Sequence, residues 1–138
     1  MGDGILAIFP THEVSPCGRA LDAAEAALDR IDRLNERRAG AGLPFTGVHL
    51  ALHVGEVLYG NIGSRDRLDF TVVGPAVNEV SRIEAMCRNV DQRVVISSAF
   101  AEAAGDQRRR LVSLGRYALR GVRRPEELFT LDPEAAAA

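Results

Sequence analysis

The stretch that decides the fold runs from Asp69 to Cys87 and reads DFTVVGPAVNEVSRIEAMC. Its first five residues, DFTVV, predict a short strand over 69–73, closed by a Gly-Pro pair. Proline suits the first turn of a helix, where its missing N–H is not needed. The apolar residues that follow recur at helical spacing: Val77, Val80, Ile83 and Cys87. The segment therefore predicts a strand that leads directly into a helix packed on one side.

Two polar residues of this helix, Asn78 and Arg82, are four positions apart and so project from one face. That face lies roughly opposite the apolar stripe. A guanidinium presents a fork of donors that matches phosphate oxygens, and a neighbouring amide can orient a hydroxyl or ring oxygen. The spacing alone fits either a solvated helix face or a pair that faces a phosphorylated ligand.

The rest of the chain mixes strands and helices. An amphipathic pattern predicts a helix over 18–38, and alternation over 48–54 predicts a strand with two distinct faces. The glycine-bounded segment 55–63 is typical of a hairpin partner. Shorter signals predict further elements: a strand over 5–9 after a Gly-rich turn, a strand over 93–96, a short helix over 97–104, and two or three strands ending near residue 131. The class is therefore α/β or α+β, in one domain over 1–131 with a disordered tail over 132–138.

Composition narrows the function classes. The 138 residues are 46% hydrophobic and 26% charged, which is ordinary for a folded globular protein. A net charge of -2 gives no sign of nucleic-acid binding, and no apolar run approaches the roughly 20 residues of a membrane span. All 17 basic residues are arginine. Any chemistry that needs a lysine ammonium must therefore come from outside this chain.

Cysteine and histidine give no sign of a metal site. The two cysteines lack metal-ligand spacing, and without a secretory context they indicate a reducing, cytoplasmic compartment. His49 and His53 are four apart, but in a strand-like stretch rather than on a helix. Asp3, between two glycines at a turn, either shapes the turn or offers a carboxylate to a divalent ion.

Four blocks in order combine these signals: GDGILAIF at 2–9, HVGEVLYGNIG at 53–63, FTVVG at 70–74 and VNEVSRIE at 77–84. Together they resemble the catalytic domain of the class III adenylate and guanylate cyclases. The resemblance extends from residue 1 to about residue 131. It implies a ferredoxin-like α/β domain that forms a head-to-tail homodimer with nucleotide sites at the interface.

The resemblance also implies roles for individual residues. Asp3 matches one of two aspartates that hold two Mg²⁺ or Mn²⁺ ions. Asn78 matches the asparagine that orients the ribose, and Arg82 the arginine that stabilises charge on the reacting phosphate. Thr71 falls at a purine-selecting position, where a bacterial subgroup with threonine resembles adenylate cyclases. Arg120 matches a basic residue near the triphosphate.

Arg65, or Arg67 beside it, is a weaker match to a phosphate-contacting residue. The first metal aspartate and the phosphate-cradling segment of the family precede Met1, so we expect a domain truncated at its N-terminus. By itself it should cyclise nucleotides weakly or not at all. The expected parent protein is a bacterial adenylate cyclase with an upstream regulatory domain, converting ATP to cyclic AMP and pyrophosphate. The alternatives are a guanylate cyclase and a non-catalytic, cyclase-like dimerisation or sensing module.

Overall fold

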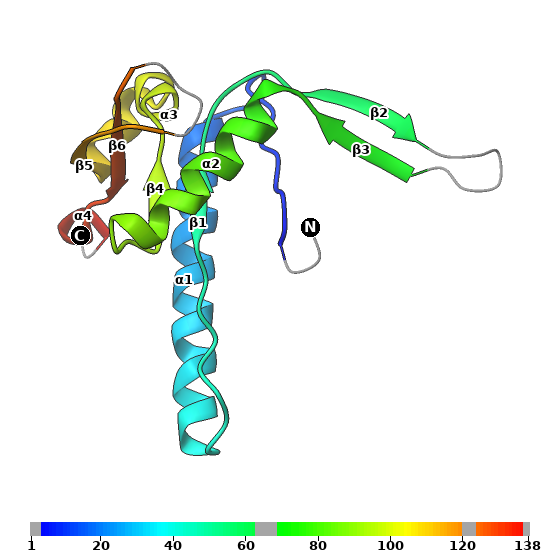
Figure 1. Cartoon of the computed structure of the whole chain (residues 1–138). Helices are drawn as coiled ribbons and strands as arrows, with labels where there is room; N and C mark the ends of the chain where they lie inside the picture. Colours follow the sequence, from blue (N-terminus) through cyan, green and yellow to red (C-terminus); the bar gives the residue numbers. More distant parts are fainter. Residues whose placement is uncertain (1–3, 63–68, 120–123, 137–138) are drawn as a thin grey trace. The chain divides into compact units, whose positions relative to one another are not determined.

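The structure, a computed structural model, describes residues 4–62, 69–119 and 124–136 (Figure 1). The chain divides into two compact units, Met1–Gly47 and Val48–Ala138. Its helices and strands mix as the sequence predicts for an α/β or α+β class. Within the described ranges, no helix is both long enough and apolar enough to cross a membrane.

The first unit consists mainly of the helix α1, Pro16–Gly40, which confirms the helix predicted over 18–38. A proline occupies its first turn, and Arg37 and Arg38 lie in its last turn, where positive charge interacts favourably with the helix dipole. The segment after the helix is held by Asn35. Its side-chain amide donates to the Thr46 carbonyl and accepts from the Thr46 N–H, both at 2.8 Å.

The strand predicted over 5–9 is wrong. Residues 4–10 have no regular secondary structure, and Ile5 is 95% exposed. A strand is stable only where its backbone N–H and C=O groups pair with a neighbour. None of the strands in the described part of the chain pairs with this segment, so its apolar composition alone does not make it a strand.

The second unit is built on a four-stranded sheet in the order β1-β4-β6-β5. Its strands are β1 (Leu50–Leu52), β4 (Val94–Ile96), β5 (Leu111–Tyr117) and β6 (Glu126–Leu131). β1 and β4 pair in parallel, and the other neighbours are antiparallel. A parallel pair needs a crossover, and the helix α2, Pro75–Asn89, lies in that connection and packs on both strands. β1 is shorter than the strand predicted over 48–54.

The core of this unit lies between α2 and the sheet. Ile83 and Cys87 of α2 pack with Val95 of β4, Leu128 of β6 and Leu119, and all five side chains are buried. This contact uses the later half of the predicted apolar stripe. Val77 and Val80, in its first half, are only partly buried.

A separate two-stranded ribbon, β2 (Leu58–Ile62) and β3 (Asp69–Val73), leads away from the start of α2 (Figure 1). The strand predicted over 69–73 is confirmed, and the segment predicted as a hairpin partner over 55–63 forms β2, which pairs with β3 and not with β1. After β4 come the short helix α3 (Ser98–Ala103) and a 3-10 helix at Gly105–Arg110. The last helix, α4 (Pro133–Ala136), lies where the sequence predicted a disordered tail.

Candidate functional site

The start of α2 is set by a close approach of two backbone segments. Gly74, the residue before the helix, has φ of 138°, a conformation that disfavours residues with a Cβ. A Cβ at this position would lie 3.1 Å from the Glu56 carbonyl oxygen. Pro75 then begins the helix directly. The turn from β3 into α2 is therefore tight, and the loop between β1 and β2 packs against it.

This geometry presents Asn78 and Arg82 on the outer face of α2. Both residues are exposed, whereas Ala76, Ile83 and Met86 of the same helix are buried. Helical spacing predicts that Asn78 and Arg82 lie on the face opposite the apolar residues, and this is confirmed. Neither Asn78 nor Arg82 forms a hydrogen bond or an ion pair with another residue in the described parts of the chain. An amide and a guanidinium are thus presented together to solvent.

Beneath this face, His53 connects three elements of the unit. It follows β1 directly, and its side chain is 7% exposed. Its Nδ1 lies 2.7 Å from the hydroxyl oxygen of Ser97, and its Nε2 lies 2.6 Å from a carboxylate oxygen of Glu79 on α2. The contact with Glu79 is short, but it is not an aligned hydrogen bond, since Nε2 has no hydrogen-bond partner among the described residues. It is a close contact between the imidazole ring and the carboxylate.

Ser97 anchors this arrangement because it is itself fixed. The residue is fully buried, and its hydroxyl oxygen accepts from the Phe100 N–H at 3.0 Å as the N-cap of α3. Its own N–H donates to the Leu52 carbonyl at 3.0 Å. The spacing of His53 from His49, which gives no sign of a metal site, does not predict this role. A histidine directly after an apolar strand and two residues before a glycine was the available signal.

The two cysteines are not candidates for nucleophilic chemistry. Burial, and secondarily the nearby Glu84 carboxylate, raise the pKa of the Cys87 thiol from its usual 9.0 to about 11. Burial also raises the pKa of Cys17. Both thiols are buried, so at neutral pH they remain protonated and unreactive.

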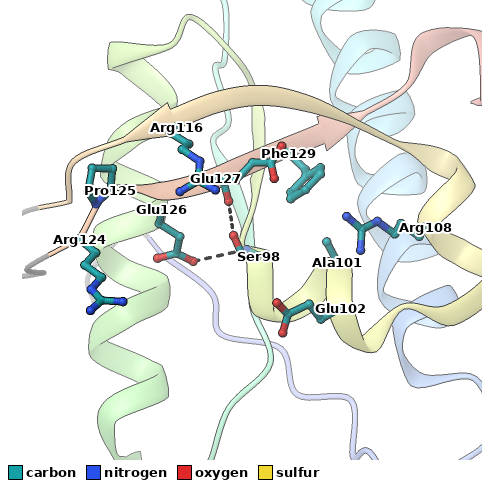
Figure 2. A pocket seen from close by; sticks show the side chains of 10 residues that line it. All are labelled: Ser98, Ala101, Glu102, Arg108, Arg116, Arg124, Pro125, Glu126, Glu127 and Phe129. Atoms are coloured by element: carbon teal, nitrogen blue, oxygen red, sulfur yellow. Dashed lines mark hydrogen bonds between the residues drawn. The ribbon is translucent and has the colours of Figure 1, made fainter.

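A cavity of about 380 Å³ lies elsewhere in the second unit, over α3 and the β5–β6 pair (Figure 2). Three arginines and three glutamates are among its lining residues: Arg108, Arg116, Arg124, Glu102, Glu126 and Glu127. Ser98 also lines the cavity. It donates its N–H to the Glu126 carboxylate and its hydroxyl to the Glu127 carbonyl. Neither Asn78 nor Arg82 lines this cavity, so it is separate from the exposed face of α2.

Comparison with known proteins identifies the fold and the family. No protein-family model matches the chain. An uncharacterized protein of Mycobacterium tuberculosis H37Rv, Rv1318c, is 34% identical over 131 residues, covering 92% of this chain. An adenylate cyclase of Anabaena cylindrica is 32% identical over 100 residues, covering 72% of this chain. The crystal structure of the guanylyl cyclase Cya2 matches with a TM-score of 0.67 and 28% identity over 86% of this chain.

The chain belongs to the class III nucleotide cyclases. It spans about a quarter or less of the two relatives, 23% of Rv1318c and 20% of the Anabaena enzyme. It covers 59% of the Cya2 chain. The ferredoxin-like α/β class expected from the sequence is confirmed as that of a cyclase catalytic domain.

Within this cyclase domain, the structure describes only part of the predicted site. Asn78 and Arg82 are brought together on α2. The backbone of Thr71 lies in β3, paired with Gly60 of β2, but its side chain is outside the described part of the structure. Three predicted site residues also lie outside the described residues: Asp3, Arg65 and Arg120.

The described residues contain no group of three or more His, Cys, Asp or Glu side chains placed to hold a metal ion. The ligand that the family resemblance implies, Asp3, is outside them. The metal role of that residue therefore stays a prediction.

Proposed function

We propose that this chain is the catalytic domain of an adenylate cyclase, which converts ATP to 3′,5′-cyclic AMP and pyrophosphate. The observation that supports it most directly is the exposed pair on α2. Asn78 and Arg82 share one outer face of a helix whose opposite face is buried in the core. A rigid helix of this kind holds both groups at a constant separation, which is what orientation of a phosphorylated substrate requires.

In this proposal each group has a distinct task. The ribose 3′-hydroxyl gives its proton to solvent water, and its oxygen forms a bond to the α-phosphorus. The bond from that phosphorus to the oxygen that bridges it to the β-phosphate breaks, and pyrophosphate leaves. Arg82 stabilises the negative charge that develops on the reacting phosphate, since its guanidinium matches phosphate oxygens. Asn78 orients the ribose by hydrogen bonding from its amide. Thr71 contacts the purine, and Arg120 and Arg65 approach the triphosphate.

Two Mg²⁺ or Mn²⁺ ions complete the proposed site, with Asp3 among their ligands. When bound, such ions lower the pKa of the attacking hydroxyl and neutralise charge on the triphosphate. We further propose that the site forms at the interface of a homodimer. The outward presentation of Asn78 and Arg82 supports this, since an exposed helix face needs a second surface to enclose a nucleotide.

A second candidate is the same reaction with GTP, favoured by the match to a guanylyl cyclase. A hydroxyl at Thr71 can hydrogen-bond either purine, so this side chain permits both. The adenylate cyclase name of the Anabaena relative supports ATP. The much greater length of the relatives supports an accompanying regulatory domain in the whole protein.

The decisive experiment measures cyclic AMP and cyclic GMP formed from ATP and GTP with Mn²⁺. It is performed on this chain and on a longer protein extended upstream of Met1. Asn78→Ala and Arg82→Ala should each lower kcat by about 10²-fold or more, as removal of a group that stabilises transition-state charge does. Asp3→Ala should abolish metal-dependent turnover.

Arg88→Ala is the matched control, because Arg88 is exposed on the same helix but lies in its last turn, away from the pair. It should keep full activity. Since all of these α2 side chains are exposed, their substitution should change the unfolding free energy by no more than about 0.5 kcal/mol. A folded protein extended upstream of Met1 that turns over neither nucleotide would contradict the proposal and favour a non-catalytic dimerisation module.

A further inference from the structure

We propose that His53 is a positioning residue, which acts through Glu79 to hold the first turns of α2 in the orientation that presents Asn78 and Arg82 to substrate. The inference rests on the proposed function, because it assigns His53 a part in the action of that pair. His53 does not itself touch the nucleotide.

His53 links α2 to Ser97, a buried residue whose position is fixed by hydrogen bonds. Ser97 is held on both sides, by the Phe100 N–H and by the Leu52 carbonyl, and it places the imidazole through the 2.7 Å contact at Nδ1. The opposite nitrogen then meets Glu79 at 2.6 Å. An almost completely buried ring between two short contacts has little freedom to rotate.

Through Glu79, the restricted His53 ring also restricts the part of α2 that carries Asn78 and Arg82. Glu79 follows Asn78 directly and lies three residues before Arg82, within a single turn of α2. The carboxylate of Glu79 reaches inward to His53, while Asn78 and Arg82 remain exposed. The contact between Glu79 and His53 therefore restricts rotation of α2 about its own axis. Such a rotation would change the direction in which Asn78 and Arg82 point.

Small rotations of α2 are sufficient to affect catalysis. Side chains extend about 5–6 Å from a helix axis, so a rotation of about 10° moves their tips by about 1 Å. A displacement of this size can reduce the rate on the order of 10²-fold when it disturbs the alignment of reacting groups. The effect should fall on kcat, because Arg82 stabilises charge that develops during the reaction.

The chain contains its own control for this contact. His49, in the segment that leads into β1, lies 3.9 Å from Glu84 on α2, at Nδ1 and Oε1 respectively. The pair joins the same two parts of the unit but is longer and more exposed, with 34% and 51% of the two side chains accessible. It lies beyond Arg82 along the helix. Loss of this pair should therefore leave the orientation of the first turns unchanged.

The test compares His53→Gln and Glu79→Ala with His49→Gln and Glu84→Ala in the longer protein that is extended upstream of Met1. We expect His53→Gln and Glu79→Ala each to lower kcat by 10-fold or more with KM changed less than about threefold. The double variant should be no worse than the more severe single variant. Glu79→Gln, which keeps an oxygen facing the ring, should recover most of the kcat lost in Glu79→Ala. The His49 and Glu84 variants should keep their kcat within twofold.

A second measurement does not depend on turnover. A spin label attached through Arg82→Cys reports the order of α2 beside the pair, and one at Arg88→Cys reports the end of the helix. The two natural cysteines are buried and should not be labelled. His53→Gln should increase label mobility at position 82 and leave it unchanged at position 88.

These two measurements separate the possible failures. If the protein turns over nucleotides but His53→Gln changes neither kcat nor the label at 82, the positioning role is refuted while the cyclase activity stands. If no nucleotide is turned over but the label at 82 loosens in His53→Gln, the proposed function fails and the support of α2 stands. A kcat that falls equally in the His49 control would also refute a specific role for His53.

Discussion

Replacement of Gly55 by alanine tests the close contact that holds the β1–β2 loop against α2. A Cβ at Gly55 would lie 2.7 Å from the Cβ of Ala76 in the first turn of the helix. Carbon atoms in contact are ordinarily about 3.5–4.0 Å apart. The loop or the helix must therefore move by about 1 Å. The same methyl would also lie 3.4 Å from the His53 Nε2, so the shift would affect the support of α2 as well.

The expected cost follows from what overpacking does in tightly packed interiors. Forcing an extra methyl group into such a contact costs about 1–3 kcal/mol. Alanine gains about 0.4–1 kcal/mol over glycine by restricting the unfolded chain, which offsets part of this. We therefore expect Gly55→Ala to lose about 1–2 kcal/mol of unfolding free energy, measured by urea denaturation. Gly40→Ala is the control, because a Cβ there meets nothing within 4 Å at the end of α1, and it should be neutral or slightly stabilised.

A compensating change makes the test specific to the contact. Ala76→Gly removes the opposing methyl and leaves the new Cβ at 3.5 Å from the Ala76 Cα, an ordinary distance. The double variant should therefore lose less than the sum of the two single variants. Additive losses, or a Gly55→Ala protein as stable as the parent, would refute the close packing of this loop on α2.

Three further predictions concern the core and the supporting contacts. Between pH 9.0 and about 11 the folded protein keeps a proton on Cys87 that the unfolded chain releases, so urea unfolding should show stability falling as pH rises through this window, with a smaller fall in Cys87→Ala. Leu128→Ala should cost about 2–5 kcal/mol because the side chain is fully buried, whereas Val112→Ala, partly exposed on β5, should cost much less by the same measurement. Ser97→Ala should cost about 1–2 kcal/mol through loss of the cap of α3. Ser81→Ala, at an exposed serine whose hydroxyl donates to the Val77 carbonyl of the same helix, should stay within about 0.5 kcal/mol in thermal unfolding.

The predictions that succeeded depend on short-range order. The strand over 69–73 and the helix that begins at Pro75 were predicted because a Gly-Pro pair and helical spacing act within a few residues. The exposure of Asn78 and Arg82 follows from the same periodicity, since an apolar stripe on one face leaves the opposite face to solvent. The chemical roles proposed for these two residues rest on family resemblance, not on spacing.

The predictions that failed depend on partners distant in the chain. The segment over 5–9 has the composition of a strand, but none of the described strands pairs with it, and no property of its own residues shows this. The spacing of His53 from His49 does not predict its contacts, which are with residues 26 and 44 positions away. The periodicity of apolar residues reports on neighbours within a few positions, so it cannot predict contacts this far apart in the sequence.

The sequence by itself determined where α1, the β2–β3 ribbon and α2 form, and which face of α2 remains polar. These features come from local backbone preferences and from the repeat of apolar residues, which act over one or two turns. Only the tertiary structure decided that Ser97, His53 and Glu79 meet beneath that face, and that the loop at Gly55 packs against the helix start. These contacts depend on the order of strands in the sheet. The parallel pairing of β1 with β4 brings the ends of both strands, followed by His53 and Ser97, to the same edge beside α2.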